Sequence, residues 1–227
     1  MNTKSSVFFL FLALLLFGCN QKRLIEKSSI CENIKIPCLD SKKKVSIQTK
    51  YGDIVIEIDG KSAPITSGNF LDIIQKGLYE GSTFHRVIKS PYPFTIQGGK
   101  LDLKIISSKS GVYKSEKGTK LISRQTRQLP LEIKLLNEEK PRYNKAITNP
   151  SELRLIQLAH KRGSIAMARS QRINSASTQF YISLKPLPEL DGRYAVFGKV
   201  IKGMNIVDLI EQGDFIEKTF SLESKKE

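Results

Sequence analysis

Apolar and polar residues alternate in two short segments, residues 43–48 and residues 53–59. Alternation with a period of two is typical of half-buried β-strands. Residues 51–53 have the character of a turn, so we expect a β-hairpin. From Pro64 onward the apolar residues recur three and four positions apart, which predicts a helix that begins at Pro64 and ends near Gly77.

Short β-rich segments occupy much of the remaining chain. Strands are predicted on both sides of a proline-containing turn, residues 89–93, and again at residues 163–170, 177–182 and 194–201. A second helix is predicted from Met204. Many short strands with two separated helices indicate an antiparallel barrel closed at its ends by helices.

One segment, residues 83–99, mixes core-like and polar residues. It places Arg86 next to Phe84, Val87 and Ile88 before the proline-containing turn. A cation in apolar surroundings needs a partner or a cavity, so a site is one interpretation of this segment. A strand edge with a solvated arginine is the other, and the segment alone does not decide between them.

The N-terminus has the features of an export signal. Residues 7–17 are an unbroken apolar run after Lys4, too short to span a bilayer, so residues 1–18 are predicted to be a signal peptide. The ending Leu-Phe-Gly-Cys resembles a bacterial lipobox, which predicts lipid on Cys19 and a lipid-anchored tether over residues 19–43. We therefore expect an exported, membrane-anchored lipoprotein at the periplasmic or extracytoplasmic face.

Two further cysteines, Cys31 and Cys38, lie within this tether with six residues between them. In an oxidising compartment they could form a disulfide, and two free thiols are the alternative. The sequence leaves both open. A cysteine pair with no histidine nearby is a poor zinc site, and we expect no metal.

The chain carries a net charge of +15, and nine of these charges lie within residues 100–162. That stretch is too long for an ordinary loop, so we expect a basic insertion at about residues 103–160 that is functional or partly disordered. Residues 129–132 are predicted to form a short ordered patch, and His160 is expected to be exposed. A solvated loop is favoured slightly over a surface that binds anionic lipid, and nucleic acid is not expected as a partner.

Three blocks of the chain read F-H-R-V-I with F-T-I-Q-G-G, I-A-M-A-R-S with S-T-Q-F-Y-I, and L-D-G-R-Y-A-V-F-G-K-V-I-K-G-M-N-I-V. They occur in the order seen in the cyclophilin family of peptidyl-prolyl cis-trans isomerases, and the chain resembles that family over about residues 44–212. The resemblance implies a mainly β fold, a closed eight-stranded antiparallel β-barrel capped by two α-helices. We expect this domain at residues 44–217, followed by a polar tail at residues 218–227.

The resemblance implies an enzyme that speeds rotation about X-Pro bonds. Uncatalysed rotation has a barrier of about 20 kcal/mol because amide resonance is lost in the twisted transition state. By resemblance, the Arg86 side chain donates a hydrogen bond to the prolyl nitrogen in that state, and Gln97 assists it. This chemistry needs no cofactor, nucleophile or general base, which fits a chain with only two histidines.

The resemblance also implies a substrate-binding surface, and this sequence departs from the family at several points. The expected substrate-binding residues are Phe94, Thr95, Ala168, Arg169, Ser170, Gln179, Tyr181, Leu190 and Tyr194. Two extra residues lengthen the turn before Phe94, and Thr95 stands where many members have Met. Glu189 stands where cyclosporin-sensitive members have Trp, so we expect weak cyclosporin binding.

The sequence supports one leading hypothesis and two alternatives. The leading one is an isomerase that assists folding of exported proteins, with proline-containing polypeptides as its partners and a monomeric state. The first alternative is a proline-peptide binding or chaperone module of low activity. The second is a membrane-anchored interaction protein that acts through its basic insertion on an anionic surface.

Overall fold

The structure is a computed structural model that describes residues 37–101, 104–105, 112–115, 118–123 and 127–222. The chain divides into two compact units, Met1–Pro37 and Cys38–Glu227, and the elements below belong to the second. Within the described ranges, no helix is both long enough and apolar enough to cross a bilayer. The predicted signal peptide, with Cys19 and Cys31, lies outside the described residues. Cys38 is disulfide-bonded.

Eight strands form one antiparallel sheet, in the order β13-β1-β2-β12-β10-β11-β4-β3. Their bounds are β1 Lys42–Thr49, β2 Gly52–Asp59, β3 Arg86–Val87, β4 Thr95–Gly98, β10 Ser164–Met167, β11 Phe180–Ser183, β12 Val196–Lys202 and β13 Lys218–Leu222. The sheet has the mainly β, eight-stranded antiparallel character that the sequence predicts.

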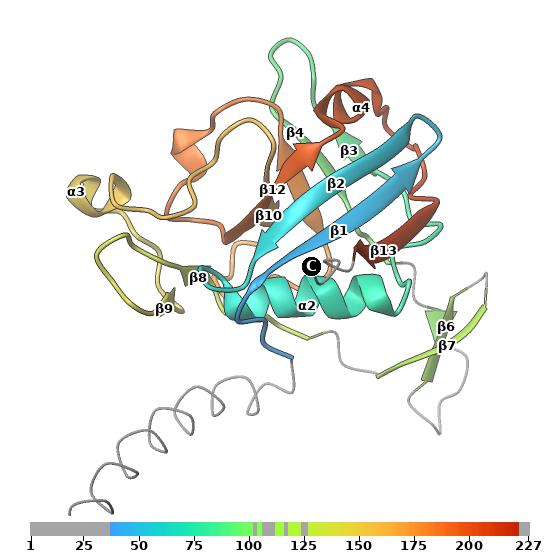
Figure 1. The fold of residues 1–227 in the computed structure, drawn as a ribbon, viewed down its shortest axis with the longest axis horizontal. Coiled ribbons are helices and arrows are strands. Elements are labelled where there is room, and N and C mark those ends of the chain that lie inside the picture. The colour runs from blue at the N-terminus through green and yellow to red at the C-terminus, as the bar shows by residue number, and fades with distance from the viewer. Residues whose placement is uncertain (1–36, 102–103, 106–111, 116–117, 124–126, 223–227) are drawn as a thin grey trace, which may run out of the picture. The chain divides into compact units, whose positions relative to one another are not determined.

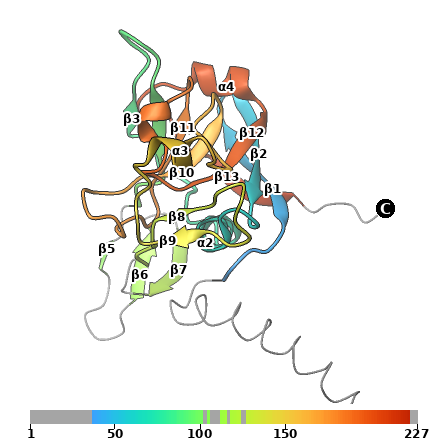
Figure 2. The ribbon, with the colours of Figure 1, turned by 90° about the vertical axis from the view of Figure 1, so that its left-hand side faces the viewer.

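The remaining elements are helices and two small sheets. The helices are α2 Pro64–Gln75, α3 Pro150–Leu153 and α4 Met204–Leu209, with a 3-10 turn at Pro188–Leu190. The small sheets comprise β5 Lys104–Ile105, β6 Val112–Ser115 and β7 Gly118–Ser123, and β8 Glu132–Ile133 with β9 Arg142–Tyr143. The predicted helices at Pro64 and Met204 are confirmed, and they lie at opposite ends of the large sheet (Figure 1, Figure 2).

The predicted closed barrel needs a correction, because the sheet curls without closing strictly. Its edge strands are β3 and β13, and no ladder joins them. They approach through the segments that precede each strand, where Thr83 and Phe215 form a single bridge. The Gly81 N–H donates to the Ile216 carbonyl at 2.7 Å, and the Phe84 N–H donates to the Asp214 carbonyl at 2.8 Å. With only two residues in β3, the contact between the edges does not extend into a ladder.

The C-terminal strand is a second correction. Residues 218–222, which were predicted to begin a polar tail, form β13 and pair with β1. The sequence of β13 lacks the usual alternation of apolar and polar residues, because the apolar Phe220 is exposed, like Lys218, and the polar Thr219 is buried. The Thr219 hydroxyl donates to the Ile74 carbonyl of α2 at 3.5 Å.

The core between α2 and the sheet is built from aromatic rings. Phe70 of α2 lies 4.9 to 5.5 Å, centroid to centroid, from the rings of Tyr79, Phe180 and Phe197. These rings and Phe84 are fully buried. Tilted and edge-on contacts between buried rings add to the free energy of burial, so this cluster fixes α2 against the inner face of the sheet.

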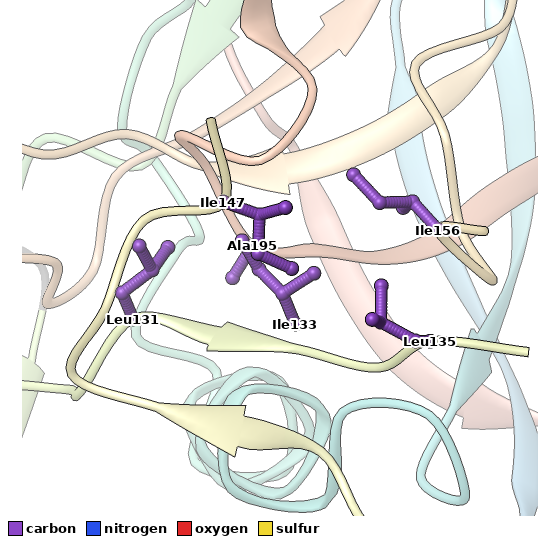
Figure 3. Close-up of a cluster of buried hydrophobic side chains, with 6 residues drawn as sticks. All are labelled: Leu131, Ile133, Leu135, Ile147, Ile156 and Ala195. Carbon is purple, nitrogen blue, oxygen red and sulfur yellow. The ribbon is translucent and has the colours of Figure 1, made fainter. Parts of the chain in front are cut away.

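Residues 127–160 of the basic insertion are not a solvated loop. Its apolar side chains form a second cluster with Ala195, which directly precedes β12 (Figure 3). The cluster consists of Leu131, Ile133, Leu135, Ile147, Ile156 and Ala195. The predicted ordered patch at residues 129–132 is confirmed, since Leu129, Leu131 and Glu132 are buried.

We expect Ile133→Val to lower the free energy of unfolding by about 1 kcal/mol, because it removes one buried methyl group from this second cluster. Urea denaturation followed by far-UV circular dichroism measures the change. Leu136→Ala is the control, since Leu136 is 59% exposed and should change stability by less than about 0.5 kcal/mol. Equal losses in the two variants would contradict a packed insertion.

Candidate functional site

A row of residues runs directly across five strands and contains the residues singled out by the sequence. Arg86 of β3 pairs with Gln97 of β4, and Gln97 pairs with Tyr181 of β11. The row continues through Ala166 of β10 to Val196 of β12. Directly opposite residues project from the same face of a sheet, so the structure brings the side chains of Arg86, Gln97 and Tyr181 to one face.

Arg86 lies at the exposed end of this row. Its side chain is exposed and makes no hydrogen bond or ion pair with any residue in the described ranges. Within those ranges Arg86 is therefore not part of a structural ion pair. Strands lie about 4.8 Å apart, so the Cα atoms of Arg86 and Tyr181 are separated by about 10 Å, a span that an arginine side chain and one proline ring can fill.

Gln97 is held by a second glutamine. Its Nε2 donates to Oε1 of Gln179 at 2.9 Å, and both side chains are half-buried. This bond fixes the orientation of the Gln97 amide beside Arg86. The two predicted site glutamines thus lie together, Gln97 within the row and Gln179 beside it.

The centre of the row is an aromatic wall. Tyr181 is buried and meets Tyr194 edge-on, with ring centroids 5.9 Å apart. The Arg169 guanidinium lies 4.8 Å above the Tyr194 ring, in cation–π geometry. Ala168, Leu158, Leu190 and Tyr194 pack against the buried cluster of Ala166, Tyr181 and Val196. The structure therefore brings together Ala168, Tyr181, Leu190 and Tyr194.

The chain after β10 forms the rim of this wall. The Ala168 N–H donates to the Gln179 carbonyl at 2.9 Å, and the Ser170 N–H donates to the Ser175 hydroxyl at 3.0 Å. Between them, the main-chain N–H and carbonyl of Arg169 have no hydrogen-bond partner within the described ranges. A backbone N–H and carbonyl that are left unpaired in this way can add an extended peptide as a further strand.

Phe94 and Thr95 follow the turn before β4 and do not belong to the row. The Phe94 N–H donates to the Ile88 carbonyl at 3.0 Å, and the Phe94 carbonyl accepts from Leu184 N–H at 2.9 Å. Phe94 is half-buried, whereas Thr95 is buried opposite Ser183. Strand alternation puts Thr95 on the face of Gln97, and no described contact joins either residue to Tyr181.

His160 is a residue of this region whose exposure was predicted wrongly. It is 2% exposed, and its Nε2 lies 2.8 Å from the Tyr181 hydroxyl oxygen. Its Nδ1 lies 2.7 Å from Asp191 Oδ1, which also accepts the His160 N–H at 2.8 Å. The surrounding basic composition indicated a surface, but the apolar residues Leu155, Ile156 and Leu158 just before it were a signal of burial.

Fold and geometry together define a class of protein. A curled antiparallel sheet with a helix at each end presents an exposed arginine, a glutamine pair and an aromatic wall on one outer face. Within the described residues there is no group of three or more histidine, cysteine or carboxylate side chains placed to hold a metal ion. The arrangement suits a protein that binds an extended peptide with an apolar ring against the wall.

The family follows from comparison with known proteins. Residues 44–225 match the family described as cyclophilin type peptidyl-prolyl cis-trans isomerase/CLD. The chain belongs to this family of isomerases.

Individual relatives agree with this assignment. A peptidyl-prolyl cis-trans isomerase of Acinetobacter baylyi is 33% identical over 171 residues, 73% of this chain and 70% of that protein. A putative thylakoid lumen peptidyl-prolyl cis-trans isomerase of Synechocystis is 32% identical over 196 residues, 82% of this chain and 48% of that protein, so this chain spans about half its length. A cyclophilin type isomerase of Cryptosporidium parvum, crystallised with the dipeptide Ala-Pro, has a TM-score of 0.52 at 25% identity, with 80% of this chain and 100% of that chain covered.

Proposed function

We propose that this protein catalyses cis-trans rotation of X-Pro bonds in polypeptides bound across the row from Arg86 to Tyr181. The observation that carries the proposal is the exposed Arg86, which has no partner among the described residues and lies in register with Gln97 and the Tyr181 wall. A guanidinium that none of those residues occupies is available to bind a substrate atom. Family membership supports the reaction, and the row supports the choice of residues.

The mechanism depends on a change in the prolyl nitrogen during rotation. As the amide twists, resonance is lost and the nitrogen lone pair becomes a better hydrogen-bond acceptor. An arginine N–H aimed at that nitrogen stabilises the twisted state more than either planar state, which is the condition for catalysis. Tyr181 and Phe94 hold the proline ring, and Gln97 orients the arginine and the substrate backbone.

The remaining predicted residues complete the substrate groove in this proposal. The free backbone groups of Arg169 pair with the substrate main chain, flanked by Ala168 and Ser170. Gln179 fixes Gln97, and Leu190, Thr95 and Tyr194 border the ring pocket. None of these steps transfers a proton, so no general base is required.

We further propose that the substrates are exported proteins and that the chain is a lipoprotein anchored through Cys19. The support is the apolar run at residues 7–17 with its lipobox-like ending, and the name of the Synechocystis relative, which places that protein in the thylakoid lumen. Metabolic labelling with a radioactive fatty acid tests the anchor, because Cys19→Ser should abolish incorporation.

The test of the proposed reaction is the relaxation of a short X-Pro peptide from its cis to its trans form, with the full chain added. Acceleration over the uncatalysed rate supports the isomerase. Binding of the same peptide without acceleration would instead favour the proline-peptide binding module.

A further inference from the structure

Tyr181 carries a hydroxyl group on the wall that faces the proline ring. The side chain is 5% exposed, and burial raises the pKa of Tyr181 well above its ordinary value, so the hydroxyl is a neutral donor and acceptor. A buried hydroxyl without a partner carries a penalty of about 1–3 kcal/mol. The wall can therefore stay apolar toward a substrate only if this hydroxyl is bonded elsewhere.

His160 supplies that bond from the end of the insertion. Its ring lies nearly parallel to the Tyr181 ring, at 7° and 5.9 Å between centroids, and its Nε2 lies 2.8 Å from the Tyr181 oxygen. The two rings are thus joined by a hydrogen bond between their edges. The contact fixes the position of the tyrosine oxygen, and through it the angle of the ring.

Asp191 fixes the direction of this bond. Its Oδ1 accepts from the His160 main-chain N–H at 2.8 Å and lies 2.7 Å from His160 Nδ1. A carboxylate can only accept, so the hydrogen of the imidazole lies on Nδ1. In the neutral ring Nε2 is then the acceptor, and the Tyr181 O–H donates to it.

The turn that carries Asp191 is itself clamped to the insertion. The Ile147 N–H donates to the Gly192 carbonyl at 2.9 Å, and Gly192 has a φ of +74°. A Cβ atom at Gly192 would lie 2.1 Å from the Ile147 carbonyl oxygen, so only glycine fits. Asp191 is therefore held at the place where it can orient His160.

We propose that His160, oriented by Asp191, is a positioning residue for the isomerase reaction, which it serves by holding the Tyr181 hydroxyl away from the substrate. This inference rests on the proposed function. The insertion thereby contributes directly to the pocket wall, although its residues touch no substrate. Without His160, the Tyr181 hydroxyl loses its partner, and the ring turns or draws water into the pocket.

The test is a double-mutant cycle on the full chain. His160→Phe keeps a ring of similar shape and removes both nitrogens, and we expect it to lower kcat/KM for an X-Pro peptide by about tenfold. In a Tyr181→Phe background there is no hydroxyl to hold, so the same substitution should change kcat/KM by less than about twofold relative to Tyr181→Phe alone. A purely structural role for His160 cannot produce this coupling.

Equal losses in the two backgrounds, or no loss in the wild-type background, overturn the inference. If His160→Phe does not fold, as judged by near-UV circular dichroism, His160→Leu replaces it, since leucine also removes both nitrogens. We then expect His160→Leu to lower kcat/KM in the wild-type background and to have little effect in the Tyr181→Phe background, and an equal loss in both backgrounds overturns the proposal. His160→Gln, whose amide oxygen can accept the Tyr181 O–H, should keep most of the activity.

The same cycle separates this inference from the proposed function. If the wild-type chain binds the X-Pro peptide but does not accelerate its relaxation, the isomerase proposal fails, and the cycle is then measured by peptide affinity. Coupling between positions 160 and 181 in the dissociation constant would still support the positioning role. Absence of both activity and peptide binding would overturn both.

Discussion

Arg86→Ala is expected to lower kcat/KM for cis-to-trans relaxation of an X-Pro peptide by about a hundredfold, the usual effect of removing one transition-state hydrogen-bond donor. The loss should fall on kcat, because the bond strengthens only as the prolyl nitrogen leaves the amide plane. Peptide affinity, which reports the planar ground state, should change much less. Relaxation kinetics and isothermal titration calorimetry on the same samples measure the two quantities.

The structure offers a matched control for this experiment. Arg154 is also exposed and follows α3, away from the row, so Arg154→Ala should leave kcat/KM unchanged. Arg86→Ala should also keep its stability within about 0.5 kcal/mol, because no described group pairs with the guanidinium. Wild-type turnover in Arg86→Ala, or an equal loss of affinity and rate, would show that Arg86 does not act on the transition state.

Arg86→Lys tests the geometry of the same group. Lysine keeps the positive charge but loses the planar fork of N–H donors, so it cannot direct a hydrogen at the prolyl nitrogen with the same geometry. We expect an activity between those of the wild type and Arg86→Ala. A lysine variant as active as the wild type would mean that charge alone suffices.

Local sequence pattern predicted the strands and helices well because their signals lie within a few residues. The hairpin of β1 and β2 and the helix from Pro64 are examples. The start of β11 was predicted at residue 177 but lies at Phe180. The Ser177 and Thr178 carbonyls accept hydrogen bonds from Asn69 Nδ2 at 2.8 Å and the Tyr79 hydroxyl at 2.7 Å, and such distant partners leave no local pattern.

Long-range contacts explain what the sequence did not reveal about the site. His160 and its partner Asp191 are 31 residues apart, and a basic stretch gives no sign that one of its members is buried. Arg86, Gln97 and Tyr181 could be named together only through resemblance to a family. Their alignment across three strands follows from sheet register, which a single sequence does not specify.

The other large expected effect concerns Glu132, which joins the insertion to α2. Ala63 is the N-cap residue of α2, and its side chain makes no capping hydrogen bond. The Glu132 carboxyl caps the helix in its place, because it accepts from Ile65 N–H at 3.2 Å and from Thr66 N–H at 2.9 Å. These donors and the Tyr143 hydroxyl favour the ionised form, but burial prevails and raises the pKa of Glu132 to about 7.

A carboxyl whose pKa is higher in the folded state stabilises that state most when it is protonated. Its contribution is complete below the usual glutamate value of 4.5 and is lost as the pH rises through about 7. A shift from 4.5 to about 7 corresponds to about 3 kcal/mol of unfolding free energy. Stability measured by urea denaturation should therefore fall by up to this amount between pH 5 and pH 8.

Glu132→Gln removes the titration but keeps an oxygen that can accept from the helix. Its free energy of unfolding, relative to the wild type, should rise by up to about 3 kcal/mol from pH 5 to pH 8. Glu80→Gln is the control, because Glu80 is exposed and its curve should run parallel to that of the wild type. Parallel curves for Glu132→Gln and the wild type would mean that the two helix N–H groups outweigh burial and keep Glu132 ionised at neutral pH. The insertion would then stabilise α2 as a charged cap, with its contribution lost on acidification rather than on alkalinisation.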